Sequence, residues 1–215
     1  MESEQSKVEN SYDKVAREYA QEFAHELESK PFDRKMLELL IEKVARRGAI
    51  CDMGCGPGQI AGYLHQIGAK ACGIDLSTQM VNEARRLYPG VDFQQGNMLD
   101  LCGVPGQTFA GIAAFYSIIH IPREFVIRAL QELRRVLQPA GVLLLTFHLG
   151  NEIIHRDEWW DKQVNLDFIF FETGEMKEYL ASAEFELDEV IEREPYRDVE
   201  YPSRRGYIFA KKAAG

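Results

Sequence analysis

The hydrophobic residues in the middle of the chain alternate between short apolar runs and helical stripes. Five short segments, each long enough for one strand, are predicted as strands: residues 48–53, 70–75, 91–95, 110–115 and 142–147. Apolar residues at spacings of three and four predict helices from about Gln59 and Ser77, and a long helix over residues 125–137 that stops at Gln138-Pro139-Ala140-Gly141. Alternating strands and helices indicate an α/β fold with a parallel sheet and helices on both faces.

The regions on either side of this core are predicted as follows. The sequence of residues 1–47 predicts two helices, one with an apolar stripe that follows a cap at Ser11 and one after Pro31. We expect the polar residues 1–9 to be frayed. Residues 148–171 show no helical period and end in a strand-like run, which indicates an insertion or lid. Residues 172–215 predict one helix followed by two strands.

The turn after the first predicted strand is rich in glycine. It follows the pattern D-x-G-x-G-x-G, with Asp52, Gly54, Gly56 and Gly58. Glycine allows a positive φ and lets a ligand lie against the backbone, and the helix that follows offers unpaired N–H groups. The dinucleotide pattern G-x-G-x-x-G fits poorly, because its third glycine would fall at Gln59.

This pattern closely resembles the first motif of class I S-adenosylmethionine-dependent methyltransferases. Residues 73–77 resemble the second motif of that family, and a helix with two strands at the end resembles its closing hairpin. The resemblance implies a Rossmann-like, seven-stranded, mostly parallel sheet in the order 3-2-1-4-5-7-6, with the last strand antiparallel. It also implies a single domain over residues 1–215, in which cap helices (1–47), a cofactor-binding core (48–147), a lid (148–171) and a C-terminal helix and strand pair (172–215) follow one another.

The resemblance also implies roles for residues at the ends of the strands. Asp52 would face the ammonium of the methionine part, and Asp75 would accept from the ribose hydroxyls, although it could instead cap the next helix. Asn97 would contact the adenine, where most relatives carry Asp. The implied cofactor site comprises Tyr12, Tyr19, Asp52, Gly54, Cys55, Gly56, Gly58, Asp75, Leu76, Met80, Asn97, Met98 and Tyr116. Tyr12 and Tyr19 lie in a segment that resembles the family's closing helix, or that simply packs on the sheet.

Three residues beyond the fourth and fifth strands are candidates for catalysis. Tyr116, His120 and His148 would lie at the carboxyl ends of neighbouring strands, where open α/β sheets bind ligands. Imidazole titrates near neutral pH, so either histidine could act as a general base, or could be a hydrogen-bonded structural residue. Later aromatic residues could form a substrate lid, or could pack an inserted strand or a dimer contact. They are His155, Trp159, Trp160, Phe168, Phe170, Phe171, Tyr196 and Tyr201, with Arg204 among them.

The expected function is methyl transfer from S-adenosylmethionine to a small-molecule acceptor, which releases S-adenosylhomocysteine. A net charge of −9 and a pI of about 5.2 argue against a nucleic-acid partner. Since the sequence shows no leader and no apolar run of membrane-spanning length, we expect a soluble, cytoplasmic monomer or homodimer without a membrane partner. The four cysteines lack zinc-like spacing, so no metal site is predicted.

Two alternatives come from other functional classes. One is a non-catalytic module that binds S-adenosylmethionine, which the change to Asn97 and the lack of a certain base would allow. The other is a nucleotide-dependent oxidoreductase, which Pro57-Gly58 and the closing strands disfavour. The sequence around Tyr116 lacks the Asp/Asn-Pro-Pro-aromatic signature, which argues against methylation of amino groups on nucleobases or glutamine.

Overall fold

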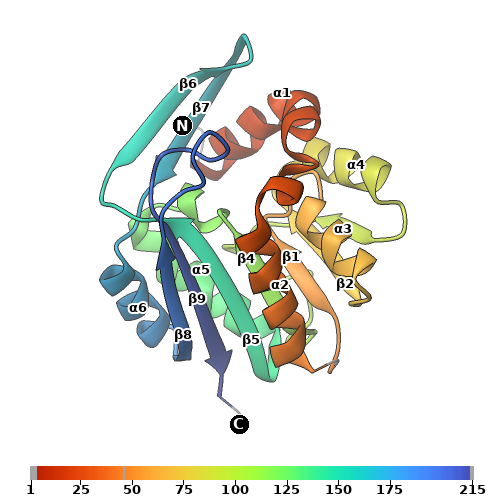
Figure 1. The fold of residues 1–215 in the computed structure, drawn as a ribbon, viewed down its shortest axis with the longest axis vertical. Coiled ribbons are helices and arrows are strands. Elements are labelled where there is room, and N and C mark those ends of the chain that lie inside the picture. The colour runs from red at the N-terminus through yellow and green to blue at the C-terminus, as the bar shows by residue number, and fades with distance from the viewer. Residues whose placement is uncertain (1–3, 46, 214–215) are drawn as a thin grey trace.

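The structure, a computed structural model, describes residues 4–45 and 47–213. Its main element is a seven-stranded sheet with the strand order β3-β2-β1-β4-β5-β9-β8 (Figure 1). The strands of this sheet are β1 (Ile50–Met53), β2 (Ala71–Asp75), β3 (Asp92–Gln95), β4 (Phe109–Phe115), β5 (Leu137–His148), β8 (Phe185–Arg193) and β9 (Arg205–Lys212).

The pairing of these strands confirms the predicted sheet. Strands β1 to β5 pair in parallel, and β9 lies antiparallel between β5 and β8. The predicted order 3-2-1-4-5-7-6 is therefore the observed one, with β8 as the sixth strand of the sheet and β9 as the seventh. The carboxyl ends of β1, β2, β4 and β5 consequently meet at one edge.

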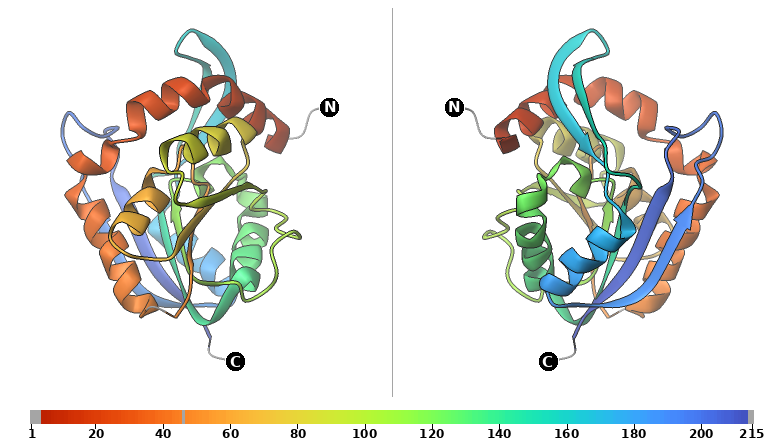
Figure 2. Two further views of the ribbon diagram at one scale, coloured as in Figure 1. Left: turned by 90° about the vertical axis from the view of Figure 1, so that its right-hand side faces the viewer. Right: turned by 90° about the vertical axis from the view of Figure 1, so that its left-hand side faces the viewer.

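Helices cover both faces of the sheet (Figure 2). Leu143 and Leu145 of β5 face the helices α5 and α6, whereas Leu144 faces α2, because side chains alternate along a strand. Helix α4 packs Val81 against Phe93 of β3. The helices are α1 (Glu4–Phe23), α2 (Pro31–Val44), α3 (Gln59–Gln66), α4 (Thr78–Leu87), α5 (Arg123–Val136) and α6 (Thr173–Ser182), with short 3-10 helices η1 (Glu26–Ser29) and η2 (Ile118–His120).

Residues 148–171 contain a hairpin that stands apart from the main sheet. Strands β6 (Ile153–Trp159) and β7 (Lys162–Ile169) pair antiparallel and project beyond the sheet beside α1 (Figures 1 and 2). Val15 of α1 packs against Val164 and Leu166 of β7. Helix α1 and the hairpin together therefore extend over the edge at which the strands end.

Helix α1 begins earlier than the sequence predicts. It starts at Glu4, so Ser11 lies inside the helix and is not its cap. The Ser11 hydroxyl donates to the carbonyl of Lys7 at 2.7 Å and accepts from the backbone N–H of Asn165 at 2.8 Å. The predicted fraying is wrong for residues 4–9; residues 1–3 lie outside the described residues. Among the described helices, none combines the length and apolar character needed to cross a membrane.

Candidate active site

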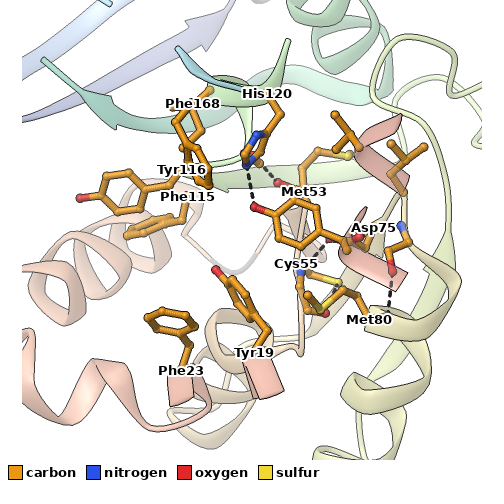
Figure 3. A pocket seen from close by; sticks show the side chains of 18 of the residues that line it. Tyr19, Phe23, Met53, Cys55, Asp75, Met80, Phe115, Tyr116, His120 and Phe168 are labelled. Carbon is orange, nitrogen blue, oxygen red and sulfur yellow. Dashed lines mark hydrogen bonds between the residues drawn. The ribbon is translucent and has the colours of Figure 1, made fainter. Parts of the chain in front are cut away.

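A pocket of about 510 Å³ lies at the carboxyl ends of β1, β2, β4 and β5, under α1 and the hairpin. Figure 3 shows its two sides: Asp75, Cys55 and Met80 lie on one, and Phe115 and Tyr116 lie on the other. All the residues predicted to bind the cofactor or to take part in catalysis line this pocket, except Gly58. Gly58 is instead the N-cap of α3. The fold thus brings into one pocket residues that are up to 136 positions apart in the sequence, from Tyr12 to His148.

The glycine turn has the backbone conformation that its residues predict. Gly54, Gly56 and Gly58 have φ values of +74°, +51° and +88°. A Cβ on Gly54 would lie 2.3 Å from the Cβ of Ser117, and one on Gly58 would lie 2.7 Å from the ring of Phe93. Gly54 and Gly58 are therefore required both because the backbone has a positive φ and because a Cβ would clash with neighbouring side chains.

Asp52 provides a buried acceptor at the base of this turn. The side chain is 1% exposed, and its Oδ2 accepts from the N–H of Ala61 at 3.1 Å. Its Oδ1 has no hydrogen-bond partner within the described residues, and neither does Oε1 of Gln59, which also lines the pocket. Burial raises the pKa of Asp52. Two buried acceptors without donors in one pocket fit a ligand ammonium, which has three N–H donors and no acceptor.

Asp75 lies at the end of β2, where its two oxygens bind the neighbouring backbone. Oδ2 accepts from Gly56 N–H and Oδ1 from Ser77 N–H, each at 2.8 Å. Helix α4 is capped by Ser77, whose hydroxyl accepts from Met80 N–H at 3.0 Å. Asp75 is thus not the cap, and each oxygen retains a lone pair for a ligand hydroxyl. Burial raises the pKa of Asp75 to about 6.

The pocket wall next to Asp75 is formed by Leu76, Met80, Asn97 and Met98. The side-chain oxygen of Asn97 accepts from the N–H of Leu99 at 2.9 Å, so this acceptor already closes a local turn. The amide NH₂ donates to no other side chain or backbone group in the described part of the chain. Asn97 therefore offers the pocket a donor more readily than an acceptor, and its contact with an adenine stays a prediction.

His120 lies between α1 and the hairpin, and both of its ring nitrogens are hydrogen-bonded. Nδ1 lies 2.9 Å from the carbonyl oxygen of Asp167, and Nε2 lies 2.8 Å from the hydroxyl of Tyr12. Since a carbonyl only accepts, Nδ1 must carry the proton, and in the neutral ring Nε2 accepts from Tyr12. Burial lowers the pKa of His120 to about 4, so the ring is neutral at pH 7.

His148 ends β5 in an aromatic environment. Its ring stacks on Phe170 with centroids 4.9 Å apart and lies 5.0 Å from the ring of Tyr116. Nδ1 lies 2.7 Å from the hydroxyl oxygen of Ser203, whereas Nε2 has no hydrogen bond within the described ranges. Burial, then Arg205 and Lys30, lower the pKa of His148 to about 3. Unlike His120, His148 therefore has a ring nitrogen that a ligand could use.

Of the aromatic residues after β5, some line the pocket and others pack in the core, as the two predicted alternatives describe. Trp159, Phe168, Phe170 and Tyr201 line the pocket, whereas Phe171 is fully buried in the core. The sequence analysis did not identify several pocket residues that carry charge or amide groups. They include Glu26, Lys30, Gln59, Arg156, Glu200 and Arg205.

Comparisons with known proteins agree with this geometry. Residues 50–141 match the family model of a methyltransferase domain. The chain is 30% identical over 136 residues to the malonyl-[acyl-carrier protein] O-methyltransferase of Enterobacter lignolyticus, covering 63% of this chain and 52% of that one. It is 29% identical over 181 residues to the ubiquinone biosynthesis O-methyltransferase of Xanthomonas campestris, covering 75% and 74%.

Among solved structures, the fold is similar to that of magnesium protoporphyrin IX methyltransferase from Synechocystis with bound S-adenosylmethionine. The TM-score is 0.73 over 98% of both chains, at 16% sequence identity, so this similarity concerns the fold. The chain spans about half the length of the curated relatives that match it at 30% identity or more.

Proposed function

Because the chain belongs to the class I S-adenosylmethionine-dependent methyltransferase family, we propose that it transfers a methyl group from S-adenosylmethionine to a small-molecule acceptor. The observation that carries this proposal is the buried Oδ1 of Asp52, which has no hydrogen-bond partner in the described part of the chain. It lies in one pocket with Asp75. A site for an ammonium beside a site for paired hydroxyls suits an amino acid joined to a ribose.

On the cofactor side, the chain binds and orients the ligand. Asp52 and Gln59 accept from the ammonium, and Asp75 accepts from the ribose hydroxyls. Gly54 and Gly56 let the ligand lie against the backbone, and Met80 and Met98 offer soft, polarizable contacts to its adenine. When bound, S-adenosylmethionine supplies a methyl group that its sulfonium already activates.

On the acceptor side, the chain aligns the nucleophile and excludes water. The wall there includes the aromatic side chains of Phe115, Tyr116 and Phe168 (Figure 3). Helix α1 and the hairpin, which pack against each other, cover the pocket. Alignment of two reactants can lower a barrier by about 7 to 11 kcal/mol when the geometry is good. For an acceptor that must lose a proton, His148 is the better base, because Nε2 of His120 is bonded to Tyr12.

The test of this function is a methyl-transfer assay with methyl-labelled S-adenosylmethionine. The protein is incubated with fractionated small-molecule extracts, and the release of S-adenosylhomocysteine is measured together with label in the product. We expect S-adenosylhomocysteine to form only when an acceptor fraction is present, and not with Asp52→Ala. Tight binding of S-adenosylhomocysteine without turnover of any acceptor would instead favour a non-catalytic binding module.

A further inference from the structure

Arg205 is a buried cation in the pocket wall. It is 3% exposed and begins β9, where it pairs directly with His148 at the end of β5. Directly opposed residues of an antiparallel pair point to the same face of the sheet, and both side chains line the pocket. The guanidinium also lies 5.8 Å from the ring centre of Tyr116. Arg205 is thus part of the wall around the candidate base.

The guanidinium of Arg205 is hydrogen-bonded on one side only. Its Nη1 donates to the carbonyl and, at 2.9 Å, to the hydroxyl oxygen of Ser203. Its Nε is fully buried and has no hydrogen-bond partner within the described ranges. Nη2 makes no hydrogen bond to the described residues either, and because Arg205 lines the pocket, Nη2 is the guanidinium nitrogen that can donate to a ligand.

The neighbouring carboxylate of Glu200 is hydrogen-bonded to Arg193. Its Oε1 lies 3.6 Å from Nε of Arg205, which is beyond a good hydrogen bond. Both Glu200 oxygens accept from Arg193, at 2.8 and 2.7 Å, and Oε2 also accepts from Tyr196 N–H at 2.7 Å. Glu200 thus forms an ion pair with the Nε side of Arg205 and leaves Nη2 without an acceptor. A buried guanidinium N–H without an acceptor is costly unless a ligand completes it.

We propose that Nη2 of Arg205 binds an anionic, carboxylate-type group on the methyl acceptor. The inference rests on the proposed function, since it names the acceptor class of the same pocket. The apolar part of such an acceptor would lie against the rings of Tyr116, Phe170 and Tyr201, which line the pocket beside His148.

Two other ligands fit this position less well. The carboxylate of the cofactor is attached next to the ammonium that Asp52 would bind at the end of β1. Strands β1 and β9 are three strand spacings apart, about 14 Å, which places Arg205 too far away. A cationic acceptor would need open aromatic faces, but Trp159 carries Arg156 on its ring at 4.9 Å and stacks on Trp160 at 4.6 Å.

The test compares a carboxylate with its neutral amide on the full chain saturated with S-adenosylhomocysteine. The probes are 2-naphthoate and 2-naphthamide, titrated by calorimetry into wild type, Arg205→Gln, Arg205→Lys and Arg204→Gln. Arg204 is the matched control, because it is the adjacent arginine and its side chain is 53% exposed. Thermal unfolding first shows whether each variant folds, and the affinity for S-adenosylhomocysteine is then measured for each protein.

We expect wild type to bind 2-naphthoate at least tenfold more tightly than 2-naphthamide. Arg205→Gln should lose this preference, Arg205→Lys should keep part of it, and Arg204→Gln should match wild type. Affinity for S-adenosylhomocysteine should change less than twofold. Equal binding of the two probes by wild type, or no binding of either, would overturn the inference even if the variants fail to fold. A loss of S-adenosylhomocysteine binding in folded Arg205→Gln would mean that Arg205 holds the cofactor, and would also overturn it.

The failure of this inference is separable from the failure of the proposed function. Wild type that binds S-adenosylhomocysteine but shows no preference for 2-naphthoate contradicts only the anionic acceptor. Wild type that does not bind S-adenosylhomocysteine contradicts the proposed function, and the inference falls with it.

Discussion

The hydroxyl of Tyr12 lies 2.8 Å from Nε2 of His120, and this contact joins the two covers of the pocket. Tyr12 belongs to α1, and Nδ1 of the same imidazole is 2.9 Å from the carbonyl oxygen of Asp167 in the hairpin. One neutral ring therefore holds a helix from the start of the chain and a hairpin from its last third. Both segments must be in place for the pocket to exclude water.

We predict that Tyr12→Phe weakens the closure of α1 over the pocket. Losing one hydrogen bond costs about 1 kcal/mol, which corresponds to about fivefold weaker binding of S-adenosylhomocysteine, mainly through faster dissociation. Stopped-flow fluorescence measures that rate. Tyr63→Phe is the control, since the Tyr63 hydroxyl bonds Glu38 outside the pocket. An equal effect of both substitutions would show that the Tyr12 contact does not act on the pocket.

Asp52→Asn should separate stability from binding. The substitution keeps an oxygen for Ala61 N–H but removes a buried carboxylate whose pKa burial raises. The ligand-free protein should be as stable as wild type or more so, whereas S-adenosylhomocysteine should bind about tenfold more weakly or worse, because a charge-assisted bond is worth about 1.5 to 3 kcal/mol. Thermal unfolding and calorimetry check the two effects. Unchanged affinity would remove Asp52 from the ammonium site.

The raised pKa of Asp75 predicts a pH dependence of cofactor binding. In the proposed function the ionised carboxylate would accept hydrogen bonds from the ribose hydroxyls, and burial raises its pKa to about 6. As pH falls below about 6 the carboxyl becomes protonated, so the affinity for S-adenosylhomocysteine should fall by up to about tenfold per pH unit. Above pH 7 it should level off. His120 and His148, with pKa values of about 4 and 3, stay neutral across this range.

The control for this pH profile is Asp75→Asn. An amide cannot titrate, so the part of the slope that Asp75 causes should disappear between pH 5 and 8, although binding will be weaker throughout. Calorimetric titrations at four pH values are sufficient. If the variant keeps the full slope of wild type, another group controls binding.

Gly54→Ala should abolish cofactor binding. The new Cβ would lie 2.3 Å from the Cβ of Ser117, and the backbone there has a φ of +74°. Gly68→Ala is a matched control, because Gly68 also has a positive φ, +91°, but a Cβ there would meet nothing within 4 Å. Both variants carry the conformational cost of about 1 to 2 kcal/mol, which thermal unfolding measures. Only Gly54→Ala should also lose S-adenosylhomocysteine in calorimetry; equal binding by both variants would contradict the close-packed turn.

The elements of the core could be predicted because their signals are local. Strands β1 and β4 are apolar runs, and the turn from Asp52 to Gly58 combines an acid with glycines that the backbone needs. The order of the strands came from the resemblance, since strand pairing depends on residues far apart in the sequence. That order is confirmed.

The start of α1 and strand β6, which belong to the segments that cover the pocket, could not be predicted in the same way. Ser11 has the chemistry of a helix cap, yet its hydroxyl instead accepts from Asn165, 154 residues away, and α1 continues through it. Strand β6 is mostly exposed, so it lacks the alternation that reveals a half-buried strand. Long-range contacts, which leave no local pattern, decide both cases.

Arg205 shows most clearly what could not be predicted from the sequence. The sequence analysis included Arg204 among the aromatic residues, but Arg204 is exposed and pairs with Glu192, whereas its neighbour enters the pocket. Successive residues of a strand point to opposite sides of the sheet. An error of one residue therefore selects a side chain on the surface in place of the one in the pocket. The irregular segment before β9 gave no register from which the correct residue could be chosen.

The measurement that tests the central claim most directly is calorimetric titration of the wild-type chain with S-adenosylhomocysteine, beside Asp75→Ala and with NAD as the control ligand. We predict binding in the micromolar range by wild type, a large loss in Asp75→Ala, and no binding of NAD. Failure of wild type to bind S-adenosylhomocysteine, or binding of NAD in its place, would contradict the account of this pocket as a methyl-donor site.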